Sequence, residues 1–156
     1  MPKHWNDDAD LVSAISENLY AALPLLPKRL VRVEAITRKF NMPFSHIQIL
    51  CMLSDRDMTI TEISASLGIA KPNITPLLDA LRERGLLERT RGTADRRIVH
   101  VHLLPEGNAL AAQIREAITA QVLEWPSSFS TGDVRRLNIA LAYLVEMANE
   151  LAASEQ

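Results

Sequence analysis

Cysteine and long apolar runs are nearly absent from this chain of 156 residues. The single cysteine, Cys51, cannot form an internal disulfide and suits a reducing compartment. No apolar run approaches the ~20 residues that a membrane-spanning helix needs, because the most apolar stretch, 19–26, is interrupted by Pro24. Residues 1–10 are polar and acidic and lack the positive start and apolar block of a secretory signal. These absences predict a cytoplasmic protein that does not enter a membrane.

The sequence also lacks the residue groupings that most enzymes need. It contains no recognisable nucleophile–base pair, no glycine-rich phosphate loop and no cluster of metal ligands. His100 and His102 fall on one face of a predicted strand and could form half of a metal site, but only His46 is available to complete it. We therefore predict a protein that is not an enzyme and that needs neither metal nor cofactor.

What the chain does have is a core and an uneven distribution of charge. Hydrophobic residues make up 47% of it, enough for one ordinary domain, and 23% of its residues are charged. The net charge of −2, taken alone, argues against a nucleic-acid binder. However, residues 28–57 and 71–103 each sum to +3, whereas residues 1–27 sum to −3 and residues 104–156 to −4. A basic middle between acidic ends leaves nucleic acid open as a partner, because binding depends on the local field.

Helical periodicity dominates both ends of the chain. Apolar residues every fourth position predict a helix over 8–23, and a second helix is expected over 27–40 with Leu30 and Ile36 inward. A helix from Pro105 should place Leu110, Ile114, Ile118, Val122 and Trp125 on one face. The last helix, capped near Ser130, spaces its apolar residues by three and four, as helices do that pack against another helix. That stripe could belong to an intramolecular core, but its length and two-ended placement favour a dimer seam. The expected seam residues are Leu11, Ile15, Leu19, Leu137, Leu141, Leu144 and Leu151.

The middle of the chain predicts two short helices joined by a tight turn. An apolar helix is expected over 44–53, and Thr59 with Glu62 then forms a capping-box pattern for a helix that ends at Gly68. The next helix, from about Lys71 to Arg84, carries an inward stripe and would turn four side chains outward toward a ligand. The stripe is Ile74, Leu77, Leu78 and Leu81, and the outward residues are Pro72, Pro76, Asp79 and Glu83. Two helices around a glycine turn are typical of a helix-turn-helix.

After Gly85 the spacing of apolar residues changes from the helical period of about 3.6 residues to the strand period of about 2 residues. Residues 86–91 and 97–103 predict two strands, and the turn residues 92–95 join them into a β-hairpin with a basic tip. The fold class expected is therefore mainly α with a small β-hairpin wing, a winged helix-turn-helix. In such a fold the second helix enters the major groove of DNA, and an arginine of the hairpin reaches the adjacent minor groove.

Three segments resemble the multiple-antibiotic-resistance regulator (MarR) family. Residues 67–89 are similar to its recognition segment, Asp95-Arg96-Arg97 to its wing signature, and 103–107 to the motif where the wing ends. The chain departs from the family pattern at Leu104, where Thr or Ser would cap the next helix, and at Pro76, where many members carry a longer polar or basic residue. The resemblance covers about residues 25–151.

The resemblance implies a homodimer, held by its N- and C-terminal helices, that represses genes until a small ligand binds. The expected organisation is residues 1–40 for dimerisation, 41–104 for the DNA-binding lobe and 105–156 for dimerisation again. The expected partners are double-stranded DNA, as a pseudo-palindromic operator, a second copy of the chain and an aromatic or lipophilic effector. The DNA-contacting residues expected are Lys71, Pro72, Asn73, Thr75, Pro76, Arg82, Arg91, Asp95, Arg96 and Arg97.

The roles of the two arginines and the function itself have alternatives that stay open. Of Arg96 and Arg97, one is expected to enter the minor groove and the other to be structural, for example paired with Asp95, and the sequence favours neither assignment. An effector pocket between the dimer helices and the lobe is assigned to Phe40, Phe44, Ile47 and Trp125. The other functions considered are a winged helix that contacts protein instead of DNA, and a thiol redox sensor acting through Cys51, although a small buried hydrophobe is the expected role of that residue.

Overall fold

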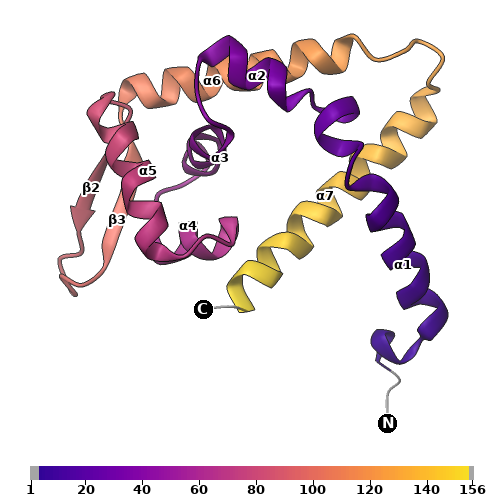
Figure 1. The fold of residues 1–156 in the computed structure, drawn as a ribbon, viewed down its shortest axis with the longest axis horizontal. Helices are drawn as coiled ribbons and strands as arrows, with labels where there is room; N and C mark the ends of the chain where they lie inside the picture. The colour runs from indigo at the N-terminus through magenta and orange to yellow at the C-terminus, as the bar shows by residue number, and fades with distance from the viewer. Residues whose placement is uncertain (1–3, 155–156) are drawn as a thin grey trace.

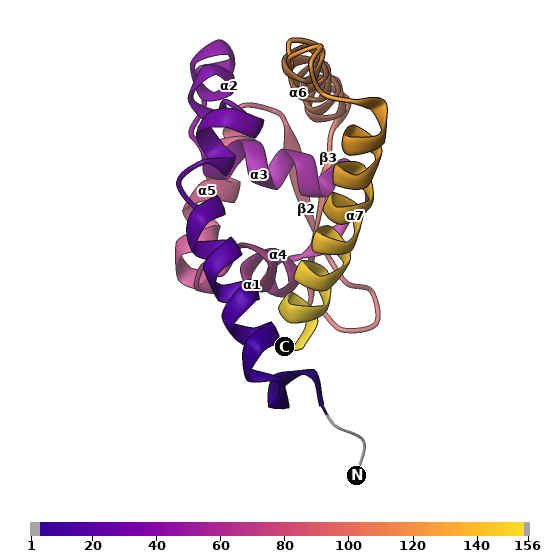
Figure 2. The same ribbon diagram turned by 90° about the vertical axis from the view of Figure 1, so that its right-hand side faces the viewer.

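The chain forms a packed lobe and two long helical arms that lie on the same side of it (Figures 1 and 2). The computed structural model describes residues 4–154. The lobe contains α2 (Val33–Phe40), α3 (Phe44–Leu53), β1 (Met58–Thr59), α4 (Ile60–Leu67), α5 (Lys71–Glu83), β2 (Leu87–Arg91), β3 (Val99–Leu103) and the first half of α6 (Pro105–Leu123). The arms are η1 (Trp5–Asp7), α1 (Ala9–Ala22) and the π-helical turn η2 (Leu26–Leu30) on one side, and the end of α6 with α7 (Thr131–Ser154) on the other.

The core of the lobe lies where α3, α4, α5 and α6 meet the sheet. Its most deeply buried side chains are large and apolar, and removing each from water contributes roughly 1.5–3 kcal/mol. They are Ile49, Leu50, Ile63, Ile74, Leu78, Leu81, Leu87, Val101 and Ile114. The inward stripe predicted for α5 is confirmed, since Ile74, Leu78 and Leu81 are buried and Leu77 is half-buried.

The helices of the lobe begin and end at the capping residues that the sequence predicted. The Thr59 hydroxyl accepts from the Glu62 amide at 3.1 Å, and the Glu62 carboxylate accepts from the Thr59 amide at 2.7 Å, which completes the capping box. Gly68 ends α4 with a φ of 61°, a conformation that favours glycine. Asn41 ends α2 in the same left-handed region, before the Pro43 break.

The sheet has three antiparallel strands in the order β1-β3-β2. The predicted hairpin of β2 and β3 pairs Leu87 with Leu103 and Arg91 with Val99. The predicted alternation in β3 is confirmed, because Val101 and Leu103 are buried while His100 is exposed. The strand β1 was not predicted, because its two residues are too few to give a periodic signal. Its Met58 pairs with Val101 of β3.

The single helix expected over 27–40 is wrong, because the chain breaks between η2 and α2. Val31 is extended, and Arg32 is held from 89 residues away by Gln121 of α6. The Arg32 amide donates to the Gln121 side-chain oxygen at 2.8 Å, and the Gln121 amide donates back to the Arg32 carbonyl at 3.4 Å. Arg32 also forms an ion pair with Glu124. A long-range contact, invisible to periodicity, therefore divides the segment in two.

The inward face predicted for α6 is confirmed in its first part and differs at its end. Ile114 is buried, and Leu110 and Ile118 are partly buried against the core as expected, whereas Val122 is exposed. The small residues Gly107, Ala111 and Ala117 also pack into the lobe. The helix begins at Pro105, and Leu104 provides no side-chain cap, as the sequence indicated. Small residues let this helix approach the lobe closely, so its path is set by side-chain size as well as by hydrophobicity.

Neither α1 nor α7 buries a single residue of its own. Figures 1 and 2 show α1 extending away from the lobe and α7 turning back until its C-terminal end lies beside α4, and α7 packs against α4 there. Among residues 4–154, no helix combines the length and hydropathy required to cross a membrane.

Candidate nucleic-acid interface

Helix α5 presents its N-terminal half to solvent. Lys71, Pro72, Asn73, Thr75 and Pro76 are all exposed, while the opposite side of the helix is buried in the lobe. The helix begins without a side-chain cap at Ala70, so the positive end of its dipole is open to an anion. The five predicted contact residues on this helix are therefore accessible to DNA together.

Pro76 lies inside α5 and changes what the helix can offer. Because proline has no amide hydrogen, the Pro72 carbonyl lacks its usual helical donor. The neighbouring Thr75 hydroxyl is directed back to the Lys71 carbonyl at 3.4 Å. The exposed first half of the helix is thus apolar at two prolines, and its polar side chains are Lys71, Asn73 and Thr75, which fits sparse hydrogen bonding to base edges.

The hairpin is closed by its own turn. The Gly92 amide donates to the Ile98 carbonyl at 2.8 Å, and the Ile98 amide donates to the Asp95 carbonyl at 3.1 Å. A Cβ at Gly92 would lie 2.7 Å from that same Asp95 oxygen, so this turn accepts only glycine without adjustment. The Asp95 carboxylate accepts from the Arg97 backbone amide at 2.9 Å. The signature aspartate thereby shapes the turn that carries the two arginines.

Both arginines of the tip point outward. Arg96 and Arg97 are exposed, and within residues 4–154 neither guanidinium forms an ion pair, including with Asp95. Arg82 of α5 and Arg91 of β2 are exposed in the same way. In Figure 1 the hairpin tip and the N-terminal end of α5 lie toward the same end of the lobe, away from α2. The predicted DNA contacts on the first half of α5 and on the hairpin are thus gathered on one end, whereas Arg82 lies near the other end of α5.

Asp79 differs from the expectation that it would face DNA freely. Its carboxylate forms an ion pair with Arg89 of β2, whose side chain is only 20% exposed. Glu83 is exposed, and within the described part of the chain it has no ion pair. Sequence patterns did not point to Arg89, because its partner lies ten residues earlier on a helix and only the packing of α5 on β2 brings the two together.

The three candidate metal ligands do not form a site. No group of three or more His, Cys, Asp or Glu side chains within residues 4–154 is arranged to hold a metal ion. His46 is buried in α3, and its Nδ1 has no hydrogen-bond partner. Burial, and then the nearby positive charge of Arg84, lowers the pKa of His46 from its ordinary value. His46 is therefore a neutral core residue at pH 7.

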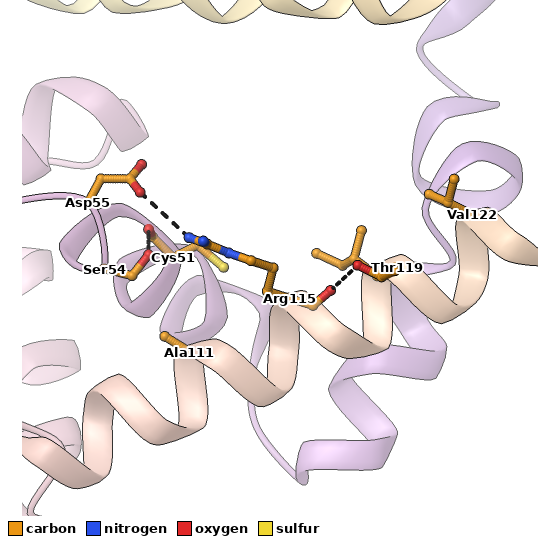
Figure 3. Close-up of a pocket in the computed structure, with 8 residues that line it drawn as sticks. Cys51, Ser54, Asp55, Ala111, Arg115, Thr119 and Val122 are labelled. Carbon is orange, nitrogen blue, oxygen red and sulfur yellow. Dashed lines mark hydrogen bonds and ion pairs between the residues drawn. The ribbon is translucent and has the colours of Figure 1, made fainter. Parts of the chain in front are cut away.

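A cavity of about 390 Å³ lies between α3 and α6 (Figure 3). Cys51, Ser54 and Asp55 line it from the α3 side, and Ala111, Arg115, Ile118, Thr119 and Val122 line it from α6. Arg115 reaches across it to Asp55 at 3.7 Å. Burial raises the pKa of the Cys51 thiol, which disfavours the reactive thiolate.

The residues assigned to an effector pocket from the sequence do not line this cavity. Ile47 is buried in the core, Phe44 is exposed at the start of α3, and Phe40 is half-buried with the Lys39 ammonium 5.6 Å from its ring. Trp125 is half-buried beyond the end of α6. Residues missed by the sequence analysis, chiefly Arg115 and Thr119, occupy the polar face of α6, where the helical pattern gave no signal.

The residues assigned to a dimer seam form exposed apolar rows on both arms. Leu11, Ile15 and Leu19 are exposed on α1, and Leu141, Leu144 and Leu151 on α7, with Leu144 at 51% and Leu151 at 68%. Only Leu137 is half-buried. Exposed apolar rows of this extent are typical of interaction surfaces. Their exposure in a single chain is consistent with a dimer seam, which stays a prediction.

Sequence comparison finds relatives among transcription regulators. The model of the MarR family matches residues 45–99, which hold α3, the helix-turn-helix and the start of β3. YsmB, an uncharacterized HTH-type transcriptional regulator of Bacillus subtilis strain 168, is 44% identical over 63 residues, which span 40% of this chain and 41% of YsmB. The HTH-type transcriptional regulator MgrA of Staphylococcus aureus is 22% identical over 116 residues, or 74% of this chain and 78% of MgrA.

Structural comparison extends the similarity beyond that segment. A mutant of MarR from E. coli complexed with operator DNA matches with a TM-score of 0.63 at 20% identity, over 81% of this chain and 93% of that chain. At this identity the similarity concerns the fold, which is a mainly helical winged helix with a small antiparallel sheet.

Proposed function

We propose that this chain, whose residues 45–99 match the MarR family model, is a DNA-binding transcriptional regulator of that family that acts as a homodimer on a pseudo-palindromic operator. The observation that carries the proposal is the joint exposure of the N-terminal half of α5 and of the arginines at the hairpin tip on one end of the lobe. A helix of this size fits the major groove, and arginine suits the negative potential of a narrow minor groove. The relatives carry the names of regulators and not of enzymes.

In this proposal the arms and the lobe have separate roles. Because α1 and α7 bury nothing within one chain, a second copy is the partner that we propose for their apolar rows. Residues 1–40 and 105–156 would then form the dimer and residues 41–104 the DNA-binding lobe. Two lobes related by a two-fold axis would contact half-sites about one helical turn apart.

We assign ligand control to the cavity between α3 and α6. Its lining is apolar at Ala111, Ile118 and Val122. Arg115 contributes a positive charge, and its long ion pair with Asp55, at 3.7 Å, leaves the guanidinium able to bind a polar group of a ligand. An aromatic or lipophilic effector that enters there would separate α6, which leads into the dimer arm, from α3 of the lobe. The spacing of the two α5 helices would change, and the regulator, acting as a repressor, would leave its operator.

The test of DNA binding is a titration of labelled duplexes, one from the region upstream of the chain's own gene and one of random sequence. We expect preference for the first duplex and an affinity that falls steeply with salt. Arg97→Ala and Arg96→Ala should each weaken operator binding, by about tenfold for the one that enters the minor groove. Asn73→Ala should reduce discrimination more than it reduces random binding. Absence of binding at low salt would favour a protein-contact role instead.

The dimer is tested separately by sedimentation. Leu144→Asp places a charge on the proposed seam and should yield monomers, whereas Arg135→Asp introduces the same residue on the other side of α7 and should leave dimers. For the effector, Thr119→Phe would fill the cavity, so a compound that releases the parent protein from its operator should no longer release this variant.

A further inference from the structure

One ion pair connects the recognition helix to the wing. Asp79 lies on α5 and Arg89 lies in the middle of β2, and their side chains meet where α5 packs against that strand. The Arg89 side chain is largely covered, whereas that of Asp79 is 41% exposed. Because the Arg89 side chain is largely covered, the pair joins a strand to a helix at a partly buried position and not on the open surface.

From Arg89 the connection continues into the tip of the hairpin. Arg89 pairs with Val101 and Arg91 with Val99 in the same ladder. The next residue, Gly92, closes the turn by donating to the Ile98 carbonyl at 2.8 Å. Arg89 is therefore joined to α5 by the ion pair, and to the turn that carries Arg96 and Arg97 by the ladder of β2 and β3.

Asp79 lies where its negative charge would be unfavourable for DNA binding. It follows Thr75 by four residues and Pro76 by three, so it shares the exposed face that would enter the groove. A carboxylate on that face repels phosphates. If its charge were its only effect, removing it would strengthen DNA binding.

We propose that Asp79 and Arg89 are positioning residues for DNA binding, and that their pair sets the angle between α5 and the hairpin. With the angle fixed, α5 enters the major groove while the arginines of the tip reach the flanking minor groove. This inference rests on the proposed function. Asp79 is then needed for affinity despite its unfavourable sign.

The test compares two carboxylates on one helix. Asp79→Asn and Glu83→Gln each remove one negative charge from α5 while keeping size, but only Asp79 has an ion pair among the described residues. We expect Asp79→Asn to weaken operator binding about fivefold and Glu83→Gln to leave it equal or stronger. Asp79→Glu, which keeps the charge, should recover most of the affinity. Operator binding by Asp79→Asn that equals that of Glu83→Gln would overturn the proposal.

A coupling measurement separates positioning from loss of stability. In the Asp79→Asn background, Arg97→Ala should cost less than it costs in the parent, because the tip is already misplaced; additive losses would overturn the proposal. Without DNA, amide exchange in residues 87–91 should accelerate in Asp79→Asn and not in Glu83→Gln, at an unchanged melting temperature for both. A parent protein that binds no duplex would refute the proposed function as well, whereas the failures named above leave it standing.

Discussion

The lobe and the arms of this molecule differ in how their apolar residues are satisfied. In the lobe, side chains such as Leu78 and Ile114 are fully buried by elements of the same chain, and polar caps complete the helix ends. In the arms, α1 and α7 carry apolar rows of similar composition and bury none of them. The lobe is therefore stabilised within one chain, whereas the apolar rows of the arms are left uncovered, and we propose a second copy of the chain as the partner that covers them.

Replacing one leucine of the lobe and one of the arms should change stability in different ways. Leu78→Ala leaves a cavity in the lobe and should lower the free energy of unfolding by about 3 kcal/mol at every protein concentration. Leu144→Ala should weaken dimerisation instead, so its effect on urea denaturation should change with protein concentration. A loss for Leu144→Ala that is independent of concentration would mean that the arm is not a dimer seam.

The next effect concerns the junction of the two regions, where α6 leaves the lobe. A Cβ on Gly107 would lie 1.9 Å from the Leu86 carbonyl oxygen, and neither backbone can yield easily. Gly107→Ala should therefore cost about 2 kcal/mol in thermal unfolding as α6 shifts outward. Gly132→Ala is the matched control, because its Cβ would approach the Ser130 hydroxyl only to 3.7 Å. Equal melting temperatures for the two variants would contradict this packing.

Between pH 7.5 and 5.5, a pH effect on stability should arise in the lobe, at His46. The pKa of His46 is lowered in the folded protein by burial and by Arg84, so the unfolded chain binds this proton more readily. The free energy of unfolding should be independent of this residue above its ordinary pKa and should fall as pH drops below that value. His46→Gln should remove that part of the acid sensitivity in urea titrations at pH 7.5 and 5.5. Identical pH profiles would show that His46 is solvated.

The smallest effect tests the missing cap of α6. Leu104→Thr supplies a side-chain acceptor at the start of that helix, where none exists, and should raise the free energy of unfolding by about 0.5 kcal/mol. Leu104→Val has a similar shape without the acceptor and should not. If both variants are destabilised equally, the apolar contacts of Leu104 outweigh a cap.

Elements of the lobe were predictable because their signals are local. Thr59 with Glu62, Gly68 and the α5 stripe each specify structure within a few residues, and all three predictions are confirmed. The helix break at Arg32 was not predictable, because it depends on Gln121. The site divides in the same way: exposure of the α5 residues and of the tip arginines followed from pattern, whereas the Asp79–Arg89 pair and the cavity at Arg115 arise from helix packing.

We propose that two lobes, held together by their arms, bind one DNA duplex through α5 and the hairpin. Hydroxyl-radical footprinting on the region upstream of the chain's own gene, combined with the mass of the complex, tests this arrangement. We predict two protected half-sites with centres about one helical turn apart, two chains per duplex, and loss of the flanking minor-groove protection in a protein carrying both Arg96→Ala and Arg97→Ala. A single protected site bound by one chain, or no protection at low salt, would contradict it.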